Sequence, residues 1–304
     1  MATATDVSLS SPASRPLSAS AVAVVLLLCV SWGFNQVSVK LALPDFPPLL
    51  QAAIRSAGAL VVVLIGVRIR GLDVFRRDGT LAAGVATGVL FALEFVFINI
   101  GLTLTTATRA IIFLYTTPFF VSLGASVLLG ERLSTVQWAG MVLSFGGVIA
   151  AIGIPQADVD SRVMIGDVML IAGALSWAGT TLIFKATRLV RAPAEKAMIY
   201  QLAISAPLLF LFGWLAGERM THWPGAVPLA AFTYQTVWVV GCTFLIWLVL
   251  MKSYPAGKLS AFTFITPLFG VAAGHYMLNE PLSAGFAVAV VLVIAGLVLV
   301  NRRS

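Results

Sequence analysis

The chain has 304 residues, of which 60% are hydrophobic and only 10% are charged, and its mean hydropathy is +1.00. Soluble domains carry roughly 25% charged residues, so this composition excludes a soluble globular protein and indicates an integral membrane protein. The two cysteines, Cys29 and Cys242, and the two histidines are too few for a disulfide framework or a metal cluster, so we expect no metal and no cofactor. The net charge of +7 does not by itself indicate nucleic-acid binding, because the basic residues must first be placed relative to the membrane.

The predicted elements begin after a polar tail. Residues 1–20 are mostly Ser, Ala, Thr and Pro, and we expect them to be disordered because they have little apolar surface to bury. Hydropathy then predicts ten apolar helices, each about long enough to cross a bilayer. Their ranges are 21–41, 48–67, 80–101, 108–129, 134–153, 164–184, 194–216, 228–250, 258–278 and 283–301. The polar stretch 154–163 divides them into two repeats of five, 21–153 and 164–301. The predicted fold class is an all-α polytopic membrane protein.

Lysine and arginine are distributed unequally between alternate loops, and the richer side of a membrane protein is cytoplasmic. One set of loops and chain ends holds fourteen of them: Arg15, Arg68, Arg70, Arg76, Arg77, Arg132, Lys185, Arg188, Arg191, Lys196, Lys252, Lys258, Arg302 and Arg303. The opposite set holds only Arg109, Arg162 and Arg219. Both termini are therefore predicted to be cytoplasmic, in a plasma membrane or bacterial inner membrane.

Two stretches of the chain resemble each other at an offset of 149 residues. Residues 109–134 and 258–283 each contain a basic residue, then Thr-Pro, then Glu-x-Leu-Ser. The matched pairs are Arg109 and Lys258, Phe113 and Phe262, Thr117 and Thr266, Pro118 and Pro267, Phe120 and Phe269, Leu129 and Leu278, Glu131 and Glu280, Leu133 and Leu282, and Ser134 and Ser283. Ser-Trp followed by a lysine also opens both halves, as Ser31-Trp32 with Lys40 and Ser176-Trp177 with Lys185. Because five spans is an odd number, the second repeat enters the membrane from the opposite side, and the halves are predicted to be inverted around a central cavity.

Each repeated stretch places a proline near the middle of a membrane span. Proline removes a backbone hydrogen bond and clashes with the preceding turn, so we expect broken helices at Pro118 and Pro267. Equivalent broken helices in two inverted halves are typical of a transporter binding site, and we predict that these two line the cavity and move as gates. The alternative is that each proline shapes a static kink whose free backbone groups are satisfied by Thr117 or Thr266.

On these paired motifs, the chain resembles the drug/metabolite transporter superfamily, EamA type. Within that superfamily it is most similar to the bacterial amino-acid and metabolite exporters of the YddG kind. The resemblance covers nearly the whole chain outside the N-terminal tail. The sequence departs from its own repeat where Pro281 follows Glu280, because Arg132 stands at the matching position of the first half.

Glu94 is the candidate for the central chemistry, since it is an acidic residue deep within a predicted span. Charged groups at such a depth usually face a cavity or a partner. We interpret Glu94 as a contact for a substrate ammonium or as a proton-coupling carboxylate. The alternatives are a structural ion pair with Arg55 and a protonated carboxyl group hydrogen-bonded within the bundle.

Basic side chains are predicted at both ends of the cavity. They are Lys40, Arg55, Arg109, Lys185 and Lys258. As a basic rim they would guide carboxylates, and Arg109 is also a candidate for substrate binding. The alternative is that their long side chains extend to lipid phosphate.

Aromatic and polar side chains complete the predicted substrate site. Trp32 and Trp177 lie too deep for an interfacial aromatic belt, so they line a cavity or pack against a neighbouring helix. Tyr234 and Trp238 share one helix face, with the same two alternatives. Further candidates for binding are Asn35, Asn99, Thr117 and Thr266. We expect Glu131 and Glu280, in contrast, to cap the helices that begin at Ser134 and Ser283.

These features together predict a secondary transporter that exports small metabolites, most specifically neutral or aromatic amino acids, by alternating access. No phosphate-binding loop of the P-loop type is present, so ATP is not expected to drive transport in this chain. The expected partners are a small-molecule substrate and lipid, without nucleic acid, and a monomer is sufficient. The alternatives are a channel or a scaffold without transport, and an intramembrane enzyme, which would need catalytic pairs that we do not find in the spans.

Overall fold

The computed structural model describes residues 17–153, 160–279, 281–282 and 285–302. All regular structure in these ranges is helical. The elements of the first half are α1 Ala19–Ala42, α2 Pro48–Arg70, α3 Leu81–Leu104, α4 Ala107–Leu114, α5 Thr117–Leu128 and α6 Thr135–Ile152. Those of the second half are α7 Ser161–Ala186, η2 Arg188–Arg191, α8 Ala194–Leu215, α9 Ala226–Thr233, η3 Tyr234–Thr243, α10 Phe244–Ser253, α11 Ala256–Ala261, η4 Phe262–Ile265, α12 Thr266–Leu278 and α13 Phe286–Val300.

Ten crossings of a membrane are built from these helices. Nine segments of the described chain are long and apolar enough to span a bilayer, and α13 is a shorter apolar helix of 15 residues. The fold class predicted from hydropathy is thus confirmed. The predicted tail lies mostly outside the described residues, as do Glu280, Ser283 and most of the polar linker.

Local sequence explains where several helices begin and end. Pro48 starts α2, and Gly71 ends it in the left-handed conformation at φ 61°. Ser134 caps α6 in a capping box with Gln137, as its hydroxyl accepts from the Gln137 N–H and its own N–H donates to the Gln137 side chain. Glu131 does not cap this helix, which corrects our expectation. Its carboxylate accepts instead from the backbone N–H of Ala256 at 2.6 Å, at the start of α11.

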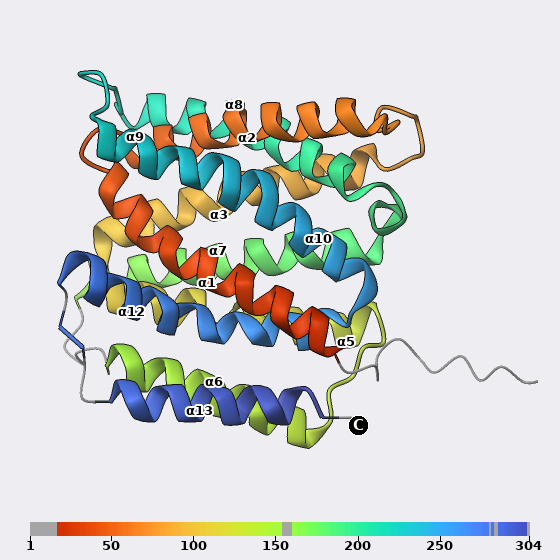
Figure 1. The fold of residues 1–304 in the computed structure, drawn as a ribbon, viewed down its shortest axis with the longest axis vertical. Helices are drawn as coiled ribbons and strands as arrows, with labels where there is room; N and C mark the ends of the chain where they lie inside the picture. The colour runs from red at the N-terminus through yellow and green to blue at the C-terminus, as the bar shows by residue number, and fades with distance from the viewer. Residues whose placement is uncertain (1–16, 154–159, 280, 283–284, 303–304) are drawn as a thin grey trace, which may run out of the picture.

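The packing between helices follows the symmetry predicted from the repeats. In Figure 1, α2 and α8 lie together at one edge of the bundle, and α6 and α13 lie together at the opposite edge. Between these edges α1 packs against α12, and α7 packs correspondingly against α5. Each of these contacts joins one half of the chain to the other, so neither half forms its core alone.

Small side chains allow α6 and α13 to approach closely. A Cβ atom added at Gly140 would lie 2.6 Å from the Gly296 carbonyl oxygen, and one added at Gly296 would lie 2.4 Å from the Gly140 carbonyl oxygen. Ser144 is fully buried in the same contact, where its hydroxyl donates to the Val293 carbonyl at 3.4 Å. Close packing at small residues is the usual way in which helices associate in lipid.

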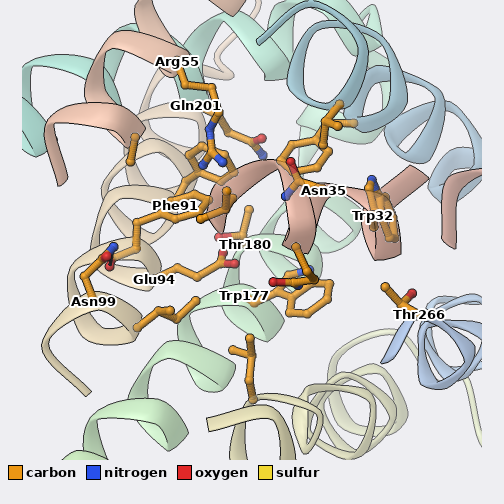
Figure 2. Close-up of a pocket in the computed structure, with 18 of the residues that line it drawn as sticks. Trp32, Asn35, Arg55, Phe91, Glu94, Asn99, Trp177, Thr180, Gln201 and Thr266 are labelled. Atoms are coloured by element: carbon orange, nitrogen blue, oxygen red, sulfur yellow. Dashed lines mark hydrogen bonds between the residues drawn. The ribbon is translucent and has the colours of Figure 1, made fainter. Parts of the chain in front are cut away.

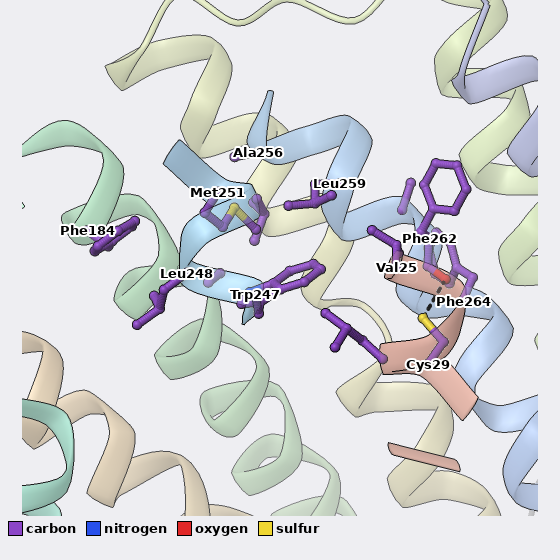
Figure 3. Packing of buried hydrophobic residues seen from close by; sticks show 14 of the residues in the cluster. Val25, Cys29, Phe184, Trp247, Leu248, Met251, Ala256, Leu259, Phe262 and Phe264 are labelled. Atoms are coloured by element: carbon purple, nitrogen blue, oxygen red, sulfur yellow. Dashed lines mark hydrogen bonds between the residues drawn. The ribbon is translucent and has the colours of Figure 1, made fainter. Parts of the chain in front are cut away.

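Apolar side chains occur on the outside of the bundle as well as inside it. Val61, Leu123, Val142, Phe210 and Val291 are each more than half exposed, as expected for helices that face lipid. The inner cluster includes Phe184, Leu248, Met251, Leu259 and Phe264, which Figure 3 shows packed where α7, α10, α11 and η4 meet.

Both helices with a Thr-Pro pair are broken immediately before it. Helix α4 ends at Leu114 and α5 starts at Thr117, while η4 is a 3-10 turn that separates α11 from α12. Pro118 cannot donate to the Leu114 carbonyl, and the hydroxyl of Thr117 donates to it instead at 2.7 Å. At the second break, the Thr266 N–H bonds to the Thr263 carbonyl, which Pro267 leaves free. The predicted breaks are therefore present.

The two ends of the described chain lie side by side. The backbone N–H of Leu17 donates to the side-chain oxygen of Asn301 at 2.9 Å, and Figure 1 shows both ends at the same side of the bundle. This arrangement agrees with an even number of spans. We refer to this side as the terminal face and to the other side as the far face.

Candidate functional site

A cavity of about 440 Å³ lies between the two halves, a size typical of small-molecule sites. Its lining extends to Leu43, Pro48 and Leu102, at the ends of α1, α2 and α3 on the far face. Towards the terminal face the lining reaches Phe184 and Met251, each two residues from the end of its helix, and both are buried. Leu43 and Leu102 are exposed, in contrast, so the cavity runs through much of the bundle and opens towards the far face.

Seven residues predicted from the sequence as binding or rim residues line this cavity. They are Trp32, Asn35, Arg55, Glu94, Asn99, Trp177 and Thr266, and Figure 2 shows their side chains around one central space. They come from five helices, α1, α2, α3, α7 and α12, so the cavity forms only when both halves are folded together.

Arg55 and Glu94 place a guanidinium and a carboxyl group in the cavity wall, from α2 and α3. The guanidinium of Arg55 stacks over the Phe95 ring, 4.6 Å from its centroid, and the side chain is buried. No ion pair within 4.0 Å joins Arg55 to Glu94 in the described chain. The structure therefore does not contain the direct ion pair between Arg55 and Glu94 that was one alternative from the sequence. Arg55 also lies in the cavity wall and not at an outer rim.

Aromatic rings form the apolar part of the wall. Trp32 donates from Nε1 to the Thr243 hydroxyl at 2.9 Å, and its ring meets Trp247 edge to face at a centroid distance of 5.3 Å. Trp177 lines the cavity from α7, the repeat-related helix in the other half. Trp32 thus lines the cavity and also packs against a neighbouring helix, so both of the roles considered for it from the sequence are present.

The terminal face is closed below the cavity by an ion pair between the halves. Lys185 donates from Nζ to Glu131 Oε1 at 2.7 Å and to the Tyr254 carbonyl at 2.6 Å. Both charged side chains are about nine-tenths buried. Because Glu131 also accepts from the N–H of Ala256, this one carboxylate joins the loop after α5 to α7 and to the start of α11. Lys185 is therefore engaged in closing this face.

The other predicted basic residues lie outside the cavity lining. Arg109 pairs with Asp167 on the far face, with Nε 3.0 Å from Oδ1. Lys258 is fully buried on the terminal side, 3.3 Å from the Arg302 carbonyl oxygen, and Lys40 is exposed near the end of α1. Long-range guidance of carboxylates by Lys258 does not fit its burial.

Tyr234 and Trp238 pack against α1 and do not line this cavity. The Tyr234 hydroxyl donates to the Ser31 carbonyl at 2.9 Å, and Trp238 Nε1 donates to the Ser31 hydroxyl at 2.9 Å. Thr117 also lies outside the lining, since its hydroxyl serves the backbone of the broken helix. Pro118 and Pro267 are buried behind the wall.

Several cavity residues were missed in the sequence. The most informative are Gln51, Tyr115, Thr180 and Gln201. Gln51 had a detectable signal, because it is a polar residue one helical turn before Arg55 in an otherwise apolar span. Tyr115 had none, since only the break between α4 and α5 brings it to the wall.

Loop carboxylates on both faces are held as anions. On the terminal face Asp78 accepts from the Thr80 hydroxyl at 2.5 Å and pairs with Lys196 at 2.9 Å, and these contacts lower the Asp78 pKa to about 2. On the far face Asp45 accepts from His222 Nε2 at 3.0 Å and from the Gly225 N–H, which lowers the Asp45 pKa below its usual value. Both interactions tie a loop of the first half to the second half.

A central cavity between two repeats, each with one broken membrane helix, is the arrangement of repeat-type membrane transporters. The model of the EamA-like transporter family matches residues 19–153 and 164–302, and the chain belongs to this family. The superfamily resemblance seen in the motifs is thus confirmed.

Two curated relatives and one solved structure extend this comparison. The chain is 27% identical over 286 residues to the uncharacterized transporter YvbV of Bacillus subtilis, which covers 92% of this chain and 91% of the relative. It is 26% identical over 288 residues to a probable amino-acid metabolite efflux pump of Salmonella typhimurium, covering 90% and 92%. A crystal structure with 21% identity superposes with a TM-score of 0.81 over 93% of this chain and 96% of the other, which supports the fold.

Proposed function

We propose that the protein exports neutral or aromatic amino acids across the bacterial inner membrane by alternating access. The observation that carries the proposal is the wall of the cavity, where Arg55, Glu94 and the rings of Trp32 and Trp177 surround one space. A zwitterion with an apolar side chain needs one cation, one anion and an apolar surface. The name of the Salmonella typhimurium relative, an amino-acid metabolite efflux pump, supports the same substrate class.

The orientation in this proposal places the terminal face in the cytoplasm. It is supported by the excess of lysine and arginine in the loops on that side. With this orientation, the structure has its cavity extending towards the outside and its cytoplasmic face closed by Lys185 and Glu131. Such an arrangement corresponds to the outward-open member of an alternating-access pair.

Counterflow in liposomes tests the proposal directly. Purified protein is reconstituted with a high internal concentration of one unlabelled compound, and entry of the same labelled compound is followed for a panel of amino acids, nucleosides and sugars. We expect transient accumulation of neutral or aromatic amino acids that saturates with concentration. Linear, non-saturating flux would indicate a channel, and accumulation of sugars or nucleosides alone would contradict the substrate class.

A further inference from the structure

Two polar side chains on one face of α2 stand out within the cavity wall. Gln51 and Arg55 are four residues apart, so they lie one above the other on the helix. Both line the cavity, yet their residues are only 3% and 5% exposed. A buried glutamine and a buried arginine in the same apolar span are costly unless their polar groups have a partner.

The described residues do not supply that partner. Arg55 Nε and Nη2 and Gln51 Nε2 have no hydrogen-bond acceptor within the described residues. Arginine remains protonated in proteins, so the buried positive charge cannot be removed by loss of a proton. The Phe95 ring positions the guanidinium by a cation–π contact, and this contact leaves Nε and Nη2 without a hydrogen-bond acceptor in the part of the chain that the structure describes.

Two other basic residues of the predicted rim, Arg109 and Lys185, do have acceptors within the protein. Arg109 is paired with Asp167, and Lys185 is paired with Glu131 and the Tyr254 carbonyl. Of these three basic residues, Arg55 is therefore the one that lines the cavity and has N–H groups without an acceptor in the described chain.

We propose that Arg55 and Gln51 form a carboxylate subsite, and that Glu94 with the side-chain oxygen of Asn35 receives the ammonium group of the same molecule. A guanidinium presents a planar fork of N–H donors that matches a carboxylate, and the Gln51 amide adds a further donor. The Asn35 oxygen has no donor of its own in the described chain. This inference rests on the proposed function and deepens it, because it requires both charges of an α-amino acid for recognition.

The first test uses the unmodified protein and three ligands that share one side chain. Phenylalanine carries both charges, phenethylamine lacks the carboxylate, and 3-phenylpropionate lacks the ammonium group. Each unlabelled ligand competes with labelled phenylalanine in counterflow. An analogue that lacks one charged group leaves buried polar groups of the site without a partner, and this weakens its binding strongly. We therefore expect each analogue to compete roughly 10- to 100-fold more weakly than phenylalanine.

The second test assigns each charge to its residue. In Arg55→Met the preference for phenylalanine over phenethylamine should disappear, while the preference over 3-phenylpropionate remains, and Glu94→Gln should give the reverse result. Arg55→Lys keeps the charge but loses the fork, so it should restore only part of the preference. Ser56→Ala is the matched control, because Ser56 is buried on the same helix outside the cavity lining and the variant should behave as the wild type.

Ligand-induced thermal stabilisation in detergent is measured in parallel, since it detects binding by variants that no longer turn over. An Arg55→Met protein that folds and still prefers phenylalanine over phenethylamine would overturn the subsite. Failure of the wild type to bind or exchange phenylalanine, with uptake of other compounds, would instead contradict the proposed function and is distinguishable from that result.

Discussion

Glu94 carries a carboxylate into the middle of the membrane span formed by α3. The cavity beside it gives the group access to water or substrate, which lowers the cost of its position in the bundle. The side chain of Asn99, five residues further along α3, has a partner within the helix, because its amide donates to the Phe95 carbonyl at 2.8 Å. Of these two polar residues, Glu94 is therefore the one that depends on what occupies the cavity.

Replacing Glu94 by glutamine should reduce transport more than stability. The neutral amide keeps the shape but loses the charge for an ammonium group, so we expect exchange to fall on the order of 10-fold or more. Counterflow per folded molecule and the melting temperature in detergent measure the two effects. Normal exchange by an unstable variant would assign Glu94 a structural role. An unchanged wild-type rate with and without a pH gradient would exclude proton coupling and leave substrate contact in place.

Asp78 provides a pH prediction at the terminal face. Its contacts with Thr80 and Lys196 lower the Asp78 pKa to about 2 in the folded protein, whereas an unfolded aspartate titrates near about 3.9. A carboxyl group with a lowered pKa stabilises the fold fully above the unfolded pKa and loses this contribution as the pH falls towards the folded pKa. Between about pH 4 and pH 2, the melting temperature of the wild type should therefore fall more than that of Asp78→Asn.

The control for this measurement is Asp73→Asn, which changes an exposed carboxylate in the same loop. Its melting temperature should follow that of the wild type over the same pH range. Parallel curves for the wild type and Asp78→Asn would show that the contacts of Asp78 do not contribute to stability.

The two broken helices satisfy their free backbone groups in different ways. Before Pro118, the hydroxyl of Thr117 donates to the Leu114 carbonyl. Before Pro267, the N–H of Thr266 donates to the Thr263 carbonyl at the end of a 3-10 turn. Pro118 and Pro267 lie in the first turns of α5 and α12, where proline is tolerated because the N–H groups there have no partner within the helix. The cost is instead that each membrane span is interrupted, and two interruptions at equivalent positions suggest a use for the breaks. Satisfied carbonyls also fit static kinks, and the gating prediction therefore needs a direct test.

Pro118→Ala and Pro267→Ala separate a gate from a static kink. If the breaks are hinges, both variants should fold, exchange substrate more slowly and shift cavity accessibility towards opposite faces, because the two helices are inverted copies. Labelling of single cysteines in the cavity from each side, together with counterflow, measures these changes. Wild-type exchange and accessibility in both variants would contradict gating.

The ion pair between Lys185 and Glu131 should hold the terminal face closed. Glu131→Gln would leave the buried Lys185 charge without its counter-ion, and opening this face would expose that charge to water. A cysteine at position 251, at the floor of the cavity, should then react several-fold faster from the terminal face. Glu195→Gln is the control, because its partner Arg70 is 62% exposed and loses little when the pair is broken. Equal reactivity of the cysteine at position 251 in the Glu131→Gln and Glu195→Gln variants would show that Glu131 does not keep the terminal face closed.

The sequence was sufficient for the elements and for their repetition. Apolar runs predicted the ten spans and the Thr-Pro pairs predicted the two breaks, because both signals depend only on local order in the sequence. The partner of a side chain depends on which helices meet. Glu131 thus caps α11 instead of α6, and Tyr234 bonds to α1 instead of lining the cavity. Gln51 was missed although its spacing of four residues from Arg55 was visible in the sequence, because that spacing does not show that the two side chains face a cavity.

At the scale of the whole molecule, topology is the expectation with the widest consequences. Single cysteines at positions 73 and 191 should react with an impermeant reagent from the cytoplasm, and one at position 221 should react from outside. The first two positions lie in loops of the terminal face and the third lies in a loop of the far face. Reaction of positions 73 and 191 from opposite sides would invalidate the inverted repeat, and reaction of all three in the reverse sense would invert the proposed orientation.

The π-helical stretch η3 in the eighth span has no counterpart in α3, the equivalent span of the first half, which is a regular α-helix throughout. If the halves were identical, exchanging their conformations would give inward- and outward-facing states of equal free energy. Unequal halves give unequal populations, and apparent affinity scales with the population that can bind. Without any gradient, the half-saturation constant should therefore differ between the two sides of the membrane. Detailed balance still requires the ratio of maximal rate to half-saturation constant to be equal in both directions. The asymmetry between the halves therefore sets the substrate concentration at which the protein works on each side. The direction of net flow is set by an external gradient.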